Sequence, residues 1–142
     1  MKWNYWDKLN PEDYIGFVYK ITNLTDSKFY IGKKYFWYNK KKKLTKKQLV
    51  DLPVTPGRKP THEIIRVESD WKTYWGSSKE LLESVRVLGE NHFECMILMP
   101  CKTKKQLTYY EMHYQCKYEC LIPGTRSYND NILGKFFTKD LA

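Results

Sequence analysis

Glu111 is the residue whose type and position are best suited to chemistry. The segment around it predicts a long helix, because apolar and tyrosine side chains recur there at helical spacing: Leu107, Tyr110, Tyr114, Tyr118 and Leu121. Glu111 lies four residues after Leu107 and three before Tyr114, at the edge of this stripe. A carboxylate that faces inward is unfavourable unless it is paired or binds a metal ion. Glu111 is therefore expected either to partner a buried tyrosine hydroxyl or lysine, or to hold a metal ion.

A metal ion held by a carboxylate, with basic side chains nearby, would suit phosphodiester hydrolysis. That reaction needs an activated water, stabilisation of charge on the phosphoryl oxygens and help for the leaving oxygen. Tyr19 and Tyr30 are the polar side chains to consider beside Glu111. Residues 15–22 and 28–33 are β-branched and aromatic and enclose turn residues, so they predict a hairpin.

The register of this hairpin decides whether the two tyrosines can act together. A four-residue loop at residues 23–26 would place Tyr19 directly opposite Tyr30 on one face of the hairpin. A loop one residue longer or shorter would place them on opposite faces. Paired tyrosines in a hairpin are compatible with plain packing as well as with chemistry.

The charge of the chain indicates a polyanionic partner. Its formal net charge is +9, with a pI of about 9.3. No acidic residue occurs from Lys33 to Val50, and aromatic residues interrupt the lysines there. Either this segment is a solvated loop, or it contacts the DNA backbone without reading sequence. The lysines expected to contact DNA are Lys33, Lys40, Lys41, Lys42, Lys43, Lys46, Lys47 and Lys59.

The elements that must position these residues follow the coarse order ββ(α)αβα. Ser77 with Glu80 predicts a capping box at the start of a helix that ends at Gly89. Residues 93–99 predict a strand that ends before Pro100. Thr103 with Gln106 predicts a second capping box. This box begins the helix that carries Glu111, and the helix is expected to run to about Leu121. This pattern predicts an α+β fold.

We expect residues 1–142 to form a single domain, with a lead-in at 1–14 and a basic insertion at about 35–69 that contains a short helix. No apolar run is long enough to cross a bilayer, and the N-terminus lacks the apolar stretch of a secretory signal. The expected location is the cytoplasm, with no membrane partner. The cysteines, Cys95, Cys101, Cys116 and Cys120, are then expected to be free thiols.

These thiols leave one alternative metal site open. His113, Cys116 and Cys120 share the helix face opposite Glu111, and Cys95, Cys101 or His92 could complete four zinc ligands. The chain has no Cys-x-x-Cys knuckle, however, and a second packed helix face accounts equally for the small apolar thiols.

Several short motifs occur in an order that resembles the GIY-YIG nuclease superfamily. They are Gly16-Phe17-Val18-Tyr19, Tyr30-Ile31-Gly32, the Ser77-Ser78 helix, Asn91-His92-Phe93-Glu94-Cys95, the helix with Glu111, and Tyr128-Asn129. The similarity spans roughly residues 16–132 and is greatest to phage-encoded homing-type endonucleases, including free-standing ones.

The resemblance implies a small three-stranded antiparallel sheet flanked by helices, and one divalent metal ion, Mg²⁺ or Mn²⁺, bound by Glu111. It also implies that Tyr19 and Tyr30 position or deprotonate the attacking water. Asn129 would hold the active-site surface, and Gly32 would permit close backbone approach. If the gene is phage-encoded, the location would be the host cytoplasm.

The chain departs from the family pattern at three places. The literal Gly-Ile-Tyr triplet is absent, and Gly76 stands where some members have a histidine. A family arginine on the first helix has no clear match, because the basic insertion occupies that region. The candidates for this catalytic cation are Lys33, Lys34, Arg58 and Arg66.

The sequence thus favours a metal-dependent endonuclease acting on double-stranded DNA, of a free-standing homing or genome-targeting kind. Two alternatives remain: a non-catalytic nucleic-acid-binding module that retains the fold, and a basic protein that inhibits another protein by binding it. One active site cuts one strand at a time, so a double-strand break would require a homodimer or sequential nicking.

Overall fold

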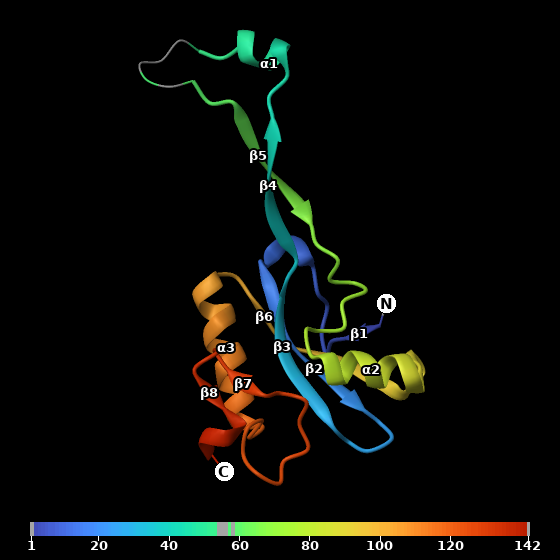
Figure 1. The fold of residues 1–142 in the computed structure, drawn as a ribbon. Helices are drawn as coiled ribbons and strands as arrows, with labels where there is room; N and C mark the ends of the chain where they lie inside the picture. Colours follow the sequence, from blue (N-terminus) through green and yellow to red (C-terminus); the bar gives the residue numbers. More distant parts are fainter. Residues whose placement is uncertain (1, 54–56, 58, 142) are drawn as a thin grey trace. The chain divides into compact units, whose positions relative to one another are not determined.

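The computed structural model describes residues 2–53, 57 and 59–141. It divides into two compact units, one formed by residues 1–36 and 70–142 and the other by Trp37–Ser69. The first unit has β1 (Trp3–Asn4), β2 (Gly16–Asn23), β3 (Phe29–Tyr35), α2 (Lys79–Leu88), β6 (Phe93–Cys101), α3 (Lys104–Lys117), β7 (Asn131–Ile132) and β8 (Phe136–Phe137) (Figure 1). Short 3₁₀ helices cover Pro11–Asp13, Glu90–His92 and Thr138–Leu141.

The central sheet of this unit has four strands in the order β1-β6-β2-β3. The α+β class is confirmed, but the sheet has one strand more than expected. β2 pairs antiparallel with both β3 and β6, whereas β1 pairs parallel with β6. The extra strand comes from the lead-in, where Trp3 is buried and packs against Phe17 and Tyr19. This tryptophan explains why part of the lead-in is ordered as a strand.

The β2–β3 hairpin has a different register from the predicted one. The backbone N–H of Asn23 donates to the carbonyl of Lys28, so the loop is residues 24–27, and Ser27 adopts a positive φ of 63°. Tyr19 consequently pairs with Gly32. The prediction that Tyr19 lies directly opposite Tyr30 was wrong. The shift is two residues, and since side chains alternate with a period of two, both tyrosines remain on one face.

Apolar residues fill both faces of the sheet. On one face Val18 and Ile31 pack with Leu107 of α3, together with Cys101 and Cys120. The other face is aromatic and gathers Trp3, Phe17, Tyr19, Phe36 and Trp71. Tyr19 of β2 and Tyr30 of β3 belong to this second face. β3 is the edge strand beside which α3 runs.

The helix ends and the strand β6 differ in detail from the sequence predictions. Ser78, not Ser77, is the N-cap of α2, and its hydroxyl accepts from the N–H of Leu81. Thr103 caps α3 as predicted, but α3 ends at Lys117, before Leu121. β6 runs through Pro100, because β1 pairs only with Cys95 and Met96 and leaves an open edge there, where proline is tolerated.

The second unit consists of β4 (Trp37–Lys43), α1 (Lys46–Val50) and β5 (His62–Glu68). The short helix was predicted, and its N-cap Thr45 forms a capping box with Gln48. The two strands were not: β4 and β5 form an antiparallel ribbon in place of a loop (Figure 1).

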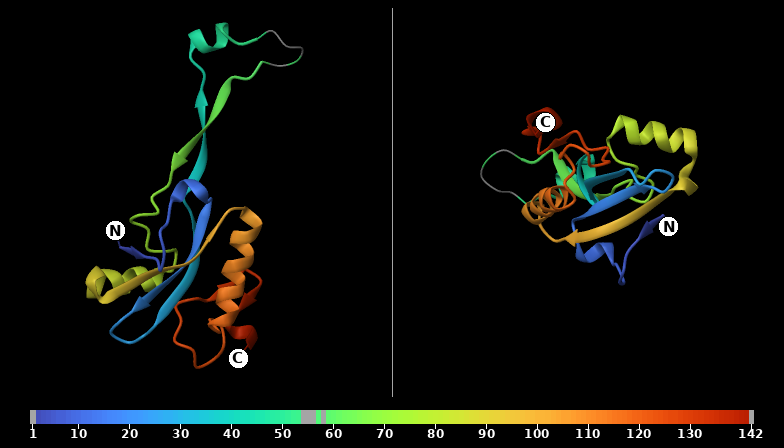
Figure 2. Two further views of the ribbon diagram at one scale, coloured as in Figure 1. Left: turned by 180° about the vertical axis from the view of Figure 1, so that it is seen from behind. Right: turned by 90° about the horizontal axis from the view of Figure 1, so that it is seen from below.

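The C-terminal segment with β7 and β8 lies next to α3 in the views of Figure 2, and Leu133 and α3 line a shared apolar pocket. Across the described residues, no helix combines the length and the apolar character needed to cross a bilayer.

Candidate active site

The site is built along the outer edge of β3. An edge strand presents N–H and C=O groups that no neighbouring strand satisfies. Ile31 is such a residue: its N–H donates to Oδ1 of Asn129 at 3.0 Å, and its carbonyl accepts from Nδ2 of Asn129 at 2.8 Å. The asparagine amide therefore replaces a neighbouring strand. Ser127 also donates to Asn129 Oδ1, which fixes the orientation of the amide.

One face of α3 follows the same edge. Nε2 of Gln115 donates to the Ile31 carbonyl at 3.1 Å. Glu111 precedes Gln115 by one helical turn, and the backbone N–H of Lys33 acts on its carboxylate. Because Ile31 and Lys33 are two residues apart, their N–H groups point to the same side of β3. Asn129, Gln115 and Glu111 thus occupy successive positions along one strand edge.

Gln115 leaves one acceptor without a partner. It is only 5% exposed, yet its Oε1 is the one buried side-chain N or O in the described residues that lacks a hydrogen-bond partner. An unsatisfied buried acceptor is unfavourable by about 1–3 kcal/mol. This oxygen therefore favours a donor or a cation in the adjacent space.

The Glu111 carboxylate is partly removed from water, and this desolvation affects its pKa. Burial raises the pKa of Glu111 above its ordinary value, and the charge and backbone N–H of Lys33 oppose this rise. The Lys33 ammonium itself donates to the Thr108 hydroxyl at 3.2 Å. Glu111 is only half-buried, so it is desolvated yet open to a ligand.

Tyr30 is fixed by a serine that the N-terminus of α2 supplies. Its hydroxyl lies 3.1 Å from Oγ of Ser77. The one-residue displacement of the N-cap to Ser78 is what leaves the Ser77 hydroxyl available. Burial raises the pKa of Tyr30, although the Ser77 contact lowers it in part. At neutral pH Tyr30 is therefore a phenol that can donate or accept a hydrogen bond.

Tyr19 lies behind Tyr30 and away from solvent. Its side chain is 1% exposed, and the two ring centroids are 6.1 Å apart. Burial, with the nearby Tyr30, Tyr74 and Glu111, raises the pKa of Tyr19 well above its usual value. Tyr19 is therefore a protonated, buried phenol beneath the tyrosine that reaches the surface.

Two glycines are required beside the tyrosines. A Cβ on Gly32 would lie 2.6 Å from the Tyr19 hydroxyl oxygen and 2.9 Å from Cε1 of Tyr30. Gly76 has a φ of +88°, and a Cβ there would lie 3.1 Å from Tyr30 Cε1. The predicted close approach at Gly32 thus occurs, whereas at Gly76 the space is tight but less crowded and the positive φ also favours glycine.

Tyr30, Glu111 and Asn129 share one cavity of about 640 Å³. Its walls come from β3, the start of α2, α3 and the segment before β7. The residues that line it are Tyr30, Ser77, Ser78, Lys79, Glu80, Glu111, Gln115, Tyr128, Asn129, Asp130, Asn131 and Leu133. Tyr19 is not among them.

The candidates for the catalytic cation are dispersed. Lys34 forms an ion pair with Asp70 at 2.6 Å and lies over the ring of Tyr74. Arg66 belongs to the second unit, where its guanidinium lies 4.0 Å from the Trp37 ring centroid. Arg58 lies outside the described residues. The charge of Lys33 acts directly on Glu111.

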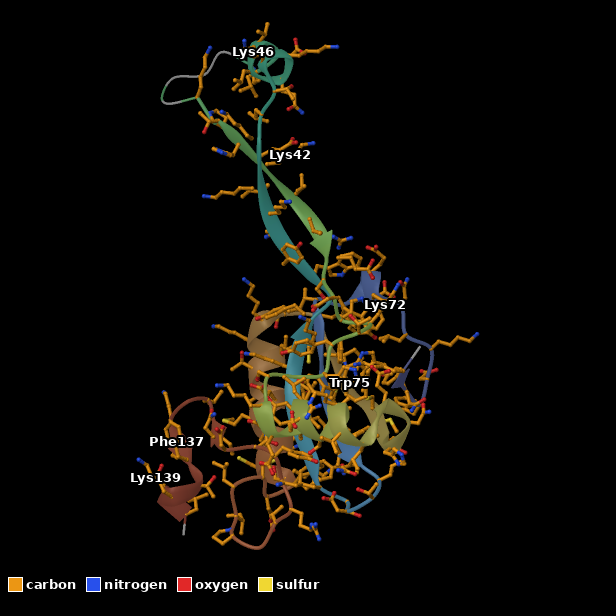
Figure 3. The ribbon with its side chains drawn as sticks, turned by 45° about the vertical axis from the view of Figure 1, so that its right-hand side comes forward. Lys42, Lys46, Lys72, Trp75, Phe137 and Lys139 are labelled. Carbon is orange, nitrogen blue, oxygen red and sulfur yellow. The ribbon has the colours of Figure 1, made fainter. Side chains whose placement is uncertain are left out.

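The lysines expected to contact DNA, apart from Lys33, fall in the second unit. Lys40, Lys41, Lys42 and Lys43 lie on β4, Lys46 and Lys47 begin α1, and Lys59 precedes β5; all are exposed. Figure 3 shows Lys42 and Lys46 extending outward from this unit.

The residues around the cavity fit a single divalent ion better than a zinc cluster. Magnesium is usually held by one or two carboxylates and the substrate phosphate, with water as the remaining ligand. Glu111 supplies one carboxylate, and the unpartnered Oε1 of Gln115 lies one turn along α3. In the described part of the chain, no three His, Cys, Asp or Glu side chains gather as metal ligands. The cysteines are free thiols, of which Cys116 is exposed.

Sequence reasoning missed Gln115 and the Tyr30–Ser77 contact. The spacing of Gln115, four residues after Glu111, could have placed both on one helix face. For Ser77, the family motif and the predicted capping box both indicated a helix start, and neither indicated a contact with Tyr30.

A comparison with known families agrees with this geometry. Residues 2–132 match a family model described as "Putative endonuclease segE, GIY-YIG domain". No curated protein and no solved structure gives a significant match. Because the matched region covers most of the chain and includes nearly all of the cavity lining, the protein belongs to the GIY-YIG endonuclease family of the segE type.

Proposed function

We propose that this protein is a metal-dependent endonuclease that hydrolyses phosphodiester bonds of double-stranded DNA. The observation that carries the proposal is the cavity in which the desolvated carboxylate of Glu111 and the Ser77-bound hydroxyl of Tyr30 share one space. A phosphate entering this space would meet both groups. The free-standing genome-targeting role suggested by the sequence fits the same activity.

Each side chain has a proposed part in the reaction. Glu111 holds the divalent ion, which when bound stabilises charge on the phosphoryl oxygens. Tyr30 positions the attacking water through its hydroxyl, because burial keeps that group protonated at neutral pH. Tyr19 supports the ring of Tyr30 from behind.

Asn129 and Lys33 complete the arrangement. Asn129 anchors the wall that precedes β7 by its two hydrogen bonds to Ile31. Lys33 is the proposed cation, because its charge already acts on Glu111. Lys34 is engaged with Asp70 and is better placed to hold the aromatic segment that precedes α2.

Nicking of supercoiled plasmid in Mg²⁺ or Mn²⁺ tests the proposal. The wild-type protein is expected to relax the plasmid, and Glu111→Gln to lose at least about 100-fold in rate, since removal of a group that stabilises transition-state charge has effects of this size. Conversion of the plasmid in the absence of divalent ions should be negligible. Sequencing the cut ends will show whether both strands break, as a homodimer would allow.

Glu94→Gln is the matched control, because Glu94 is exposed and lies outside the cavity. It removes the same charge and should cut at the wild-type rate. Salt-sensitive DNA binding by a wild-type protein that never nicks would instead support a binding module that retains the fold. Equal cutting by wild type and Glu111→Gln would remove Glu111 from the mechanism.

A further inference from the structure

The second unit carries most of the net positive charge of the chain. Residues 37–69 include nine Lys and Arg against three Asp and Glu, a balance of +6 out of the chain's +9. The β4–β5 ribbon at its centre has seven residues in each strand. Its charge complements a polyanion, but charge alone does not say which side of the ribbon meets it.

The strand register divides the ribbon into two faces. In the pairing, Asn39 lies opposite Arg66 and Lys40 opposite Ile65. Because paired residues point to the same side and successive residues alternate, each face collects every second pair. The asparagine face consists of Trp37, Asn39, Lys41, Lys43, His62, Ile64, Arg66 and Glu68. The tyrosine face consists of Tyr38, Lys40, Lys42, Glu63, Ile65 and Val67.

The two faces differ in how far they are covered. On the tyrosine face Ile65 and Val67 are half-buried, and Lys40 and Tyr38 lie directly opposite them. Long side chains in this position cover apolar neighbours with their stems. On the asparagine face every member except Trp37 is exposed, including Ile64 at 68%. An isoleucine so exposed in the middle of a strand is unfavourable in water and suits an apolar contact with a partner.

The asparagine face also presents side chains that recognise base edges. Asparagine can bond adenine and arginine can bond guanine through two hydrogen bonds each, and apolar side chains contact the thymine methyl group. Asn39 and Arg66 form one cross-strand pair, and Ile64 follows on the same face. The Trp37 ring, 4.0 Å from the Arg66 guanidinium, restricts the orientation of that group.

The dimensions of a two-stranded ribbon match the major groove. The groove is about 12 Å wide and admits such a ribbon. Seven residues of strand span about 23 Å, at about 3.3 Å for each residue. Lys41 and Lys43 continue the asparagine face beyond Asn39, where they can contact phosphates.

We propose that the β4–β5 ribbon inserts its asparagine face into the major groove of double-stranded DNA and reads base edges there. Asn39 and Arg66 contact bases, Ile64 packs against a thymine methyl group, and Lys41 and Lys43 bind phosphates. The inference rests on the proposed function, since it takes DNA as the substrate, and it adds the element that selects where the enzyme acts.

Salt-dependent binding to a short fluorescent duplex compares the faces at equal charge. All proteins carry Glu111→Gln and contain no metal, so that cleavage does not interfere. Lys41→Ala/Lys43→Ala should lower the slope of log affinity against log salt by about 0.9 for each phosphate that the variant no longer neutralises. Lys40→Ala/Lys42→Ala removes the same charge from the other face and should change the slope less. Equal slopes for the two pairs, or a larger decrease for the second pair, would overturn the assignment of the face.

Base reading is tested with a library of random duplexes. The Glu111→Gln protein should enrich a base preference, and added Asn39→Ala should flatten one position by about tenfold or more without altering the salt slope. Added Tyr38→Ala should leave the preference intact. Failure to enrich any preference, or an unchanged preference in Asn39→Ala, would show that the ribbon reads no bases.

These outcomes are separate from those of the nicking assay. A wild type that nicks plasmid while both lysine pairs behave alike would leave the nuclease and remove the ribbon assignment. A protein that never nicks but loses its base preference on Asn39→Ala would do the reverse. Circular dichroism of each variant confirms that the fold is retained.

Discussion

At the scale of single residues, Glu111 has two opposing properties. Its proposed role requires an ionised carboxylate, yet burial raises its pKa above the ordinary value of 4.5. The folded protein therefore binds this proton more tightly than the unfolded chain does. The resulting contribution to folding stability is fully present below pH 4.5 and is lost as the pH rises through the raised pKa. At neutral pH the charged Glu111 lowers stability.

Glu111→Gln should accordingly be more stable than wild type at neutral pH. Without metal, its melting temperature should exceed that of wild type above the raised pKa, and the two should converge below pH 4.5. Thermal unfolding followed by circular dichroism across this range measures the difference. Mg²⁺ should raise the melting temperature of wild type only. A variant less stable than wild type at neutral pH would show that the carboxylate is well paired in the absence of metal.

At the scale of an element, the β2–β3 hairpin depends on a glycine for steric reasons alone. Gly32 has no positive φ, but a Cβ would meet the Tyr19 hydroxyl oxygen at 2.6 Å and Cζ at 2.8 Å. Gly32→Ala should therefore destabilise the protein by about 1–3 kcal/mol, the usual effect of overpacking. Urea denaturation measures the change. Because Tyr19→Phe removes the nearer atom, the double variant should recover part of the loss.

The comparison of sequence with structure is also clearest for single elements. The recurrence of Leu107, Tyr110 and Tyr114 at helical spacing was sufficient to predict the Glu111 helix and to place Glu111 at the edge of its inner face, where it is half-buried. The hairpin was found, but its register was wrong by two residues. Ser27 accepts a positive φ in the loop, which its residue type does not reveal.

The strands of the second unit were missed for a different reason. β4 contains four consecutive lysines and no alternation of apolar with polar residues, so it resembles a solvated loop. In β5 the burial alternates, with Glu63, Ile65 and Val67 half-buried, but Glu63 is charged and Ile64 lies on the exposed side, so the sequence itself shows no clear alternation. Pairing with β5 is what orders β4, and pairing between distant segments is not visible in either segment alone.

At the scale of the whole molecule, the second unit is an insertion between two ends that meet. Phe36 and Trp71 are both buried in the first unit, with ring centroids 4.9 Å apart. A short Gly-Ser linker can therefore replace Trp37–Ser69. The shortened protein should unfold cooperatively and keep metal-dependent nicking at low salt, with weaker and less selective DNA binding. If calorimetry shows that the shortened protein does not unfold cooperatively, the first unit needs the insertion to fold.

The hydrogen bonds of Asn129 and Gln115 to the edge of β3 also bear on whether copies of the protein can associate through this edge. Asn129 and Gln115 saturate Ile31 on the side where a foreign strand would otherwise add to the sheet. An unprotected border of this kind is a template for fibril-like association. The amides that form this wall of the cavity thus also shield the β3 edge from pairing with a strand of another copy, and their loss is expected to lower solubility as well as the proposed cleavage.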